Sequence, residues 1–256
     1  MSNIKYNDLL DAGVHFGHLT RKWDPKMAPY IFMERNGIHI IDLNKTIVCL
    51  GDAASYLQSI VRSGRKVMFV ATKKQAKDIV AEQAQRLRMP YVTERWLGGM
   101  LTNFSTIRKS LKKMSSIEKL MKDEAYLNLA KRERLMISRE KAKLEKVLGG
   151  IAELTRLPAA LFVVDIKREH IAIKEAQKLN IPVIAMVDTN SNPELVDIPI
   201  PSNDDAWKSI QLITNFISKS VEEGLMERKK DKDEAKLAEE EKAKREADKV
   251  VAKDEA

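Results

Sequence analysis

Long apolar runs alternate with amphipathic stretches through most of the chain. The runs at 66–72, 160–165 and 182–188 are apolar almost throughout, as expected of strands covered on both faces of a parallel sheet. Helical periodicity between such runs indicates right-handed crossovers and an open three-layer α/β sandwich. Shorter strands are predicted at 91–93 and, at an edge of the sheet, at 198–200, with helices at 73–88, 171–179 and 204–224.

The first 64 residues have a different pattern. An amphipathic helix is predicted over 4–13, followed by a β-hairpin in which strands 30–33 and 38–41 flank the turn Asn36-Gly37. A second helix should run from about Leu43, capped by Asp42, to Ser63, where Gly64 ends it.

Residues 104–156 are too long for an ordinary crossover connection. Apolar residues recur there at spacings of three and four in two series, separated by a candidate turn at 123–129. This pattern predicts an antiparallel coiled-coil hairpin that projects from the sheet. The two series are Ile107, Leu111, Met114, Ile117 and Met121, and Ile137, Leu144, Val147, Ile151 and Leu154.

From residue 227 the chain consists mostly of Lys, Glu, Asp and Ala, and it cannot bury a core. Such a segment is either disordered or a solvated helix held by side-chain ion pairs. The predicted organisation is therefore a sandwich domain of 1–103 and 157–226, an inserted hairpin of 104–156, and a charged tail of 227–256.

Composition and charge limit the class of partner and the cellular location that we expect. The 45 Lys and Arg residues against 37 Asp and Glu give a formal net charge of +8, and the tail is nearly balanced, so the excess cation lies before residue 227. This excess favours an anionic partner such as nucleic acid. One cysteine, Cys49, excludes an internal disulfide framework. The sequence shows no membrane span and no signal peptide, so we expect a cytoplasmic protein.

The stretch 91–103 combines a strand, a cation, an aromatic ring and two glycines before the helical pattern of the insertion. Arg95 and Trp96 suit phosphates and bases, whereas a tight strand-to-helix turn with a core tryptophan explains the same residues equally well. For Trp96 itself we favour the core over a stacking platform.

Other candidate chemistry is placed at strand ends and in the loop after the first helix. His15 and His18 could face one metal or phosphate, although loop histidines that bond to backbone are the commoner case. Asp165 and Asp188 follow predicted strands, where they are either magnesium ligands or caps of the next segment. In the hairpin, bases outnumber acids about two to one, which indicates a polyanionic partner.

Several motifs, taken together and in order, resemble bacterial ribosomal protein two of the small subunit. They are Ala12 to His18, Trp96 to Asn103, Ala160 to Asp165, His170 to Ala176, and Val187 to Asn190. The resemblance covers about residues 4–224 and leaves the tail outside.

The resemblance implies a flavodoxin-like sandwich with a coiled-coil hairpin and no catalysis. It implies a structural protein of the small subunit that binds 16S ribosomal RNA between head and body, beside neighbouring ribosomal proteins. In bacteria the family also helps to dock ribosomal protein one, and Phe16 and Phe32 are similar to the positions used there.

The resemblance also implies that family members can hold a metal near that surface, and the matching positions are His18, Asp188 and Asp204. The resemblance therefore implies one divalent ion, zinc or magnesium. Our candidate RNA contacts are Arg21, Lys22, Lys73, Lys74, Arg95, Arg108, Lys109, Lys112 and Lys113.

Two other interpretations remain open at this point. One is an enzyme for a phosphorylated small molecule on a flavodoxin-like sheet, with Asp165 and Asp188 on magnesium. Against it, the sequence has no phosphate-binding loop, nucleophile elbow or dinucleotide fingerprint. The other is a free-standing RNA-binding scaffold.

Overall fold

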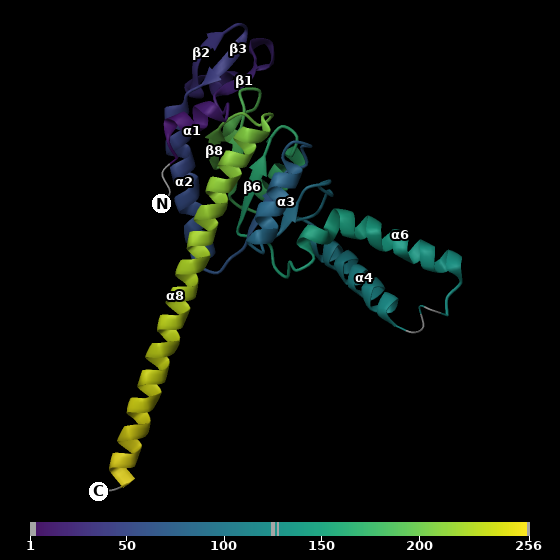
Figure 1. Cartoon of the computed structure of the whole chain (residues 1–256), viewed down its shortest axis with the longest axis vertical. Coiled ribbons are helices and arrows are strands. Elements are labelled where there is room, and N and C mark those ends of the chain that lie inside the picture. The colour runs from purple at the N-terminus through teal and green to yellow at the C-terminus, as the bar shows by residue number, and fades with distance from the viewer. Residues whose placement is uncertain (1–3, 124–125, 127, 255–256) are drawn as a thin grey trace.

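A computed structural model places a three-layer α/β sandwich at the centre of the molecule, with a helical hairpin projecting from it (Figure 1). It describes the backbone of residues 4–123, 126 and 128–254, and the side-chain surroundings as far as residue 234. The predicted turn 123–129 includes residues 124, 125 and 127, which lie outside the described residues, as do the side chains of most of the predicted tail.

The five strands of the central sheet are all parallel, in the order β5-β4-β6-β7-β8, which confirms the predicted fold class. β6 and β7 are buried along their whole length because helices cover both faces of the sheet. The strands are β4 (Val67–Val70), β5 (Tyr91–Val92), β6 (Ala160–Val164), β7 (Val183–Val187) and β8 (Ile198–Pro201).

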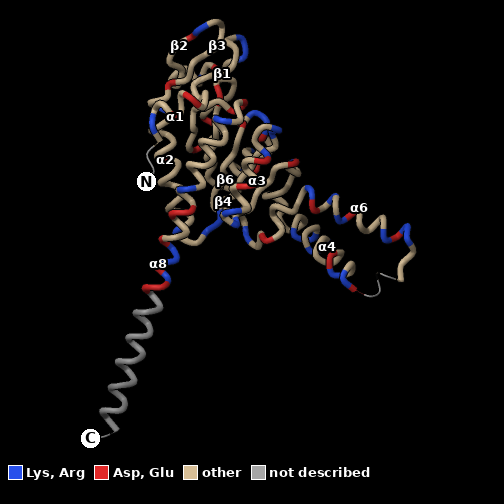
Figure 2. Tube along the Cα trace, viewed as in Figure 1, with Lys and Arg blue, Asp and Glu red and all other residues tan. Residues whose placement is uncertain are grey.

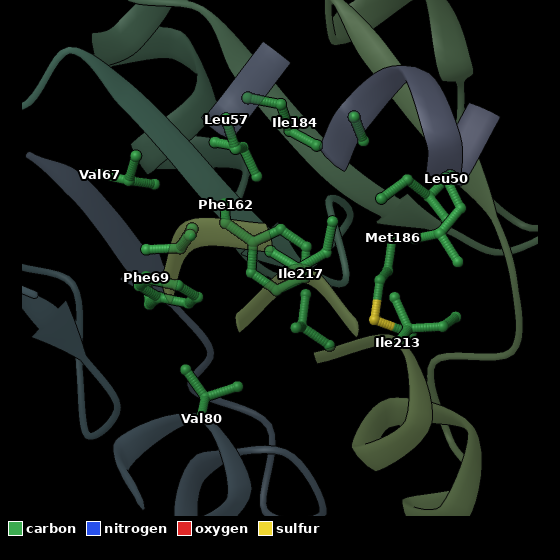
Figure 3. Close-up of a cluster of buried hydrophobic side chains, with 14 of the residues drawn as sticks. Leu50, Leu57, Val67, Phe69, Val80, Phe162, Ile184, Met186, Ile213 and Ile217 are labelled. Atoms are coloured by element: carbon green, nitrogen blue, oxygen red, sulfur yellow. The ribbon is translucent and has the colours of Figure 1, made fainter. Parts of the chain in front are cut away.

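Alternate residues of each strand point to opposite faces and form two apolar layers. On one face Phe69 and Phe162 pack edge to face, with ring centroids 5.6 Å apart, among side chains from α2, α3 and α8 (Figure 3). On the other face Val163 and Ala185 pack against α7 and the base of the hairpin. These helices are α2 (Leu43–Arg62), α3 (Lys77–Arg86), α7 (His170–Lys178) and α8 (Trp207–Asp254).

The helical hairpin consists of two antiparallel helices that extend away from the sandwich (Figure 1). They are α4 (Phe104–Lys122) and α6 (Lys131–Leu148), and a 3₁₀ turn, Gly149–Ile151, leads back to the sheet. Ile107, Leu111 and Ile117 are buried along the inner side of α4, in the predicted spacing.

The N-terminal segment forms a separate small sheet of three antiparallel strands in the order β1-β3-β2. The predicted β-hairpin is present, but Phe16–Leu19, expected in a loop, is a strand that pairs with β3. Its run Phe-Gly-His-Leu is too short and too polar to show strand periodicity. The elements are α1 (Tyr6–Asp11), β1 (Phe16–Leu19), β2 (Ile31–Arg35) and β3 (Ile38–Ile41), with 3₁₀ turns at Thr20–Lys22, Pro25–Tyr30 and, before β8, Pro193–Leu195.

The last helix differs most from its prediction. It begins at Trp207 rather than at Asp204, because the side chain of Asn203 accepts hydrogen bonds from the backbone N–H groups of Asp205 and Ala206. It also passes through Gly224 and continues to Asp254. Gly224 therefore does not end the helix, and a Cβ there would lie 2.8 Å from the backbone oxygen of Gln58 in α2. The glycine lets two helices cross closely.

None of the described helices combines the length and the apolar character that a bilayer crossing requires.

We expect Gly224→Val to lower the free energy of unfolding by about 1–3 kcal/mol, because extra carbon atoms in a close contact force the two helices apart. Gly51→Ala in α2 is the control, because a Cβ there meets nothing within 4 Å. It should raise the free energy of unfolding by about 0.5–1 kcal/mol, since alanine favours a helix over glycine. Urea denaturation measures both, and a Gly224→Val variant as stable as the unmutated protein would contradict the close crossing.

Candidate functional sites

A cluster of charged side chains lies where the strands of the central sheet end. Lys73 follows β4, Asp165 follows β6, Asp188 follows β7, and Asp204 follows β8, so the carboxyl ends of four parallel strands bring them together. His18 enters from β1 of the small sheet. We refer to these five residues, together with Asp205, as the strand-end cluster.

Lys73 is the cation at the centre of this cluster. Its Nζ lies 2.7 Å from Asp204 Oδ1, 2.6 Å from Asp205 Oδ1 and 3.4 Å from Asp165 Oδ2. Burial alone would lower the pKa of the ammonium group, but the charge of Asp204 and hydrogen bonds to Asp204 and Asp205 outweigh it and raise that pKa. Lys73 is only 8% exposed, and three carboxylates surround its ammonium group. These ion pairs make Lys73 the least accessible of the predicted RNA contacts.

His18 joins the small sheet to the cluster. Its Nδ1 lies 3.0 Å from Asp188 Oδ2, and its Nε2 lies 3.2 Å from Asp205 Oδ2. The hydrogen bond to Asp188 raises the pKa of the imidazole against the opposing effect of burial. The prediction that groups His18 with Asp188 and Asp204 fits this geometry, because one potential ligand atom from each of the three lies within 4.8 Å of the others.

The surroundings of Asp204 show whether the strand-end cluster has a free ligand atom for a cation. Its Oδ2 is buried and accepts no hydrogen bond from any described residue, although its Oδ1 accepts one from Lys73. Burial, with the nearby charges of Asp188 and Asp165, raises the pKa of Asp204 to about 7. The cluster therefore holds four carboxyl groups against one lysine and one histidine, with one oxygen unpaired. Such a donor set fits a divalent cation.

The other predicted histidine and aspartate have different surroundings. The Nδ1 of His15 is buried with no hydrogen-bond partner among the described residues, and burial lowers its pKa. His15 is not part of the three-residue metal group. Asp165 Oδ1 accepts a hydrogen bond from the backbone N–H of Arg168, 3.0 Å away, so this aspartate serves as a turn cap as well as a partner of Lys73.

The loop over 96–103 is organised around a buried carboxylate that sequence reasoning missed. Glu175, in α7, accepts hydrogen bonds from Trp96 Nε1 at 3.1 Å and from the backbone N–H groups of Gly99, Leu101 and Thr102 at 2.7, 2.9 and 3.0 Å. The Thr102 hydroxyl donates a further bond at 3.2 Å. Trp96 is 6% exposed, which agrees with the prediction of a core tryptophan. The available signal was a glutamate on the apolar face of a helix, beside Ala172 and Ala176.

Burial acts to raise the pKa of Glu175, but the N–H groups of Thr102 and Leu101, the Trp96 indole and the N–H of Gly99 outweigh burial and lower it. The carboxyl group is therefore ionised at neutral pH and is satisfied without any metal or cation.

The remaining predicted RNA contacts lie on the surface. Arg21, Lys22, Lys74 and Arg95 are exposed near the carboxyl edge of the sheet and the start of the hairpin. Lys and Arg residues recur along both helices of the hairpin (Figure 2). On α4 the exposed cations are Arg108, Lys109, Lys112 and Lys113.

Three of these α4 cations are unpaired among the described residues: Arg108, Lys109 and Lys112 form no ion pair there. Lys113 instead pairs with Glu140 across the hairpin. Their spacing places Lys109 and Lys112 on the side of α4 away from the buried Ile107, with Arg108 at the flank of that side.

Exposed apolar side chains gather on the small N-terminal sheet. Phe32 is 70% exposed on β2 and Phe16 is 48% exposed on β1, the two strands that flank β3. Leu19, Trp23 and Met33 in the same segment are also exposed. Clusters of large exposed apolar residues mark interaction surfaces more often than isolated ones do.

Comparisons with known proteins agree on one family. The profile of the family described as Ribosomal protein S2 matches residues 9–224. A protein of Cytophaga hutchinsonii, named small ribosomal subunit protein uS2, is 71% identical over 247 residues, which cover 96% of this chain and 97% of that relative.

Two further relatives carry the same name. The protein of Flavobacterium johnsoniae is 64% identical over 239 residues, covering 93% of this chain and 94% of its own. That of Parabacteroides distasonis is 60% identical over 240 residues, covering 94% and 86%.

Proposed function

Because the chain belongs to the ribosomal protein S2 family, we propose that it binds 16S ribosomal RNA between the head and the body of the small subunit and helps to dock ribosomal protein one. It is a structural, non-enzymatic protein of the small ribosomal subunit, and in bacteria that places it on ribosomes in the cytoplasm. Family membership confirms the prediction that the chain is not an enzyme and rejects the phosphate-ligand enzyme and the free-standing scaffold.

The main support for RNA binding comes from the exposed cations of α4. Arg108, Lys109 and Lys112 have no acidic partner among the described residues, and an unpaired cation on a rigid helix can neutralise a phosphate without first breaking an ion pair. Arg21, Lys22, Lys74 and Arg95 extend the cationic surface towards the sheet. Contacts of this kind fix position and register, and folded RNA is recognised mainly by its shape. The site between head and body is supported by the family resemblance.

We expect the triple substitution Arg108→Glu, Lys109→Glu and Lys112→Glu to weaken binding to 16S ribosomal RNA without changing the circular dichroism spectrum. The slope of log affinity against log salt should become shallower by about 0.9 for each duplex phosphate that the variant no longer neutralises. Filter binding over a salt series measures both quantities.

The matched control reverses Lys229, Lys230 and Lys232, three exposed lysines in the described part of α8, to Glu. It changes the net charge equally and should have a smaller effect. Equal losses of affinity in the two variants would show that only net charge matters and would remove the hairpin from the RNA-binding surface.

The metal proposal rests on the strand-end cluster. His18, Asp188 and Asp204 would hold one divalent ion, for which the unpaired Oδ2 of Asp204 is available. An imidazole ligand favours zinc over magnesium, which prefers oxygen ligands and keeps several waters. When bound, the ion would supply a positive charge among the four carboxyl groups. These residues would then join β1 to the ends of β7 and β8 and fix the small sheet on the sandwich.

We expect the purified protein to bind about one zinc ion and to unfold at a higher temperature with zinc than with chelator. His18→Ala should abolish both effects, whereas His170→Ala, an exposed histidine on α7, should abolish neither. Affinity should fall between pH 8 and pH 6, because protons on His18 and Asp204 compete with the metal. Elemental analysis after zinc loading and dialysis is the measurement, and an unmutated protein without metal would refute the site.

The docking proposal rests on the exposed Phe16 and Phe32 of the small sheet. A phenylalanine buried on binding contributes about 1.5–3 kcal/mol, which corresponds to about tenfold or more in affinity. We therefore expect Phe32→Ser to weaken binding of ribosomal protein one at least about tenfold. Leu157→Ser is the control, because this exposed leucine lies before β6, at the opposite end of the sheet. Equal affinities of the Phe32→Ser and unmutated proteins, measured by biolayer interferometry, would exclude this surface.

A further inference from the structure

The loop that joins β5 to the hairpin has its conformation determined by one carboxylate. Five donors from Trp96, Gly99, Leu101 and Thr102 converge on the two oxygens of Glu175, two on Oε1 and three on Oε2. Hydrogen bonds to a charged, buried acceptor are about twice as strong as neutral ones. The loop therefore has little freedom while Glu175 is in place.

This loop is also the root of the first hairpin helix. α4 begins at Phe104, two residues after Thr102, so the direction in which the chain leaves the loop sets the direction of α4. Glu175 belongs to α7, which packs on the sheet through the buried Ala172, Ile173 and Ala176. One carboxylate thus connects the sandwich to the base of the hairpin.

The second hairpin helix returns to the same part of the sandwich. A Cβ at Gly150, just after α6, would lie 2.2 Å from the backbone oxygen of Tyr91 in β5, so the two backbones are in direct contact. Glu94, which follows β5, lies 3.5 Å from Lys146 of α6, but this pair is exposed and contributes little. Both legs pack in the apolar layer on this face of the sheet. In addition, the returning leg has a close backbone contact at Gly150, and the loop before the outgoing leg is hydrogen-bonded to Glu175.

We infer that Glu175 is a positioning residue for RNA binding: it fixes the hairpin on the sandwich and so aims Arg108, Lys109 and Lys112 at the phosphates. This inference rests on the proposed RNA contact of α4. Glu175 itself is 8% exposed and its oxygens are occupied by the loop, so it acts through the hairpin and does not touch RNA.

Glu175→Gln tests the inference with almost no change in shape. A glutamine amide accepts at one end only and presents N–H₂ to the donors at the other, so two or three of the five bonds are broken in either orientation. Glu169→Gln is the matched control. Glu169 is also a buried glutamate at the start of α7, but it accepts hydrogen bonds from the N–H and hydroxyl of Thr72, away from the hairpin.

Hairpin position is measured directly by nitroxide distances. Labels at Ser55→Cys on α2 and Ser138→Cys on α6, both exposed, are introduced with Cys49→Ser. We expect a single narrow distance distribution that broadens in Glu175→Gln and stays narrow in Glu169→Gln. Unchanged distributions, or equal broadening in both variants, would overturn the inference.

RNA affinity supplies the second readout. Glu175→Gln should weaken binding about tenfold or more and make the salt dependence shallower, as the α4 triple reversal does. The variant that carries both Glu175→Gln and the α4 triple reversal should bind RNA little more weakly than the triple reversal alone. The effects of residues that act through one element are not additive. Additive effects on affinity would overturn the inference and leave the RNA proposal standing, whereas an α4 reversal without effect would reject both.

If Glu175→Gln fails to fold, Trp96→Phe tests the role of Glu175 instead. It removes one N–H donor and keeps an aromatic ring in the core. A smaller broadening of the distances with a smaller loss of affinity supports the inference, and no change in either overturns it.

Discussion

A carboxylate that leaves water must be paired or hydrogen-bonded, and this constraint determines how the working parts of the molecule are attached. Glu175 satisfies it with five donors from one loop, and that loop becomes the root of the hairpin. Asp204 satisfies it with Lys73 on one oxygen only, which leaves the other available to a cation. In both places, hydrogen bonds or ion pairs offset the cost of burying the charge, and they join parts of the chain that are distant in sequence.

The apolar sandwich between these connections serves as a scaffold. Its central strands β6 and β7 are buried along their whole length, and an apolar layer covers each face of the sheet. The sheet provides a rigid edge at which four strand ends meet, an arrangement that in other proteins positions ligands and catalysts. Here the edge is filled by mutual ion pairs, and the surfaces proposed for RNA and protein lie on the hairpin and the small sheet. This division suits a structural protein of the small subunit.

The sheet and the hairpin were predictable because their signals are local: continuous apolar runs for β6 and β7, and three-and-four spacing for α4. What the sequence did not show depends on contacts with residues far away along the chain. Lys73 was assigned to RNA because nothing near it shows that Asp204, over a hundred residues later, would neutralise it. The last helix was predicted to end at residue 224, because the contact of Gly224 with Gln58 cannot be read from the sequence. The three metal residues were grouped only through family resemblance, since no spacing rule relates β1 to the ends of β7 and β8.

Native-state hydrogen exchange of the loop amides tests most directly whether buried carboxylates hold the molecule together. The backbone N–H groups of Gly99, Leu101 and Thr102 lie outside helices and strands, and two of them belong to residues that are not fully buried. If Glu175 fixes them, they should exchange as slowly as the amides of β6 and β7, by openings that approach global unfolding. Exchange at the rate of an ordinary surface loop, while β6 and β7 stay protected, would contradict the account.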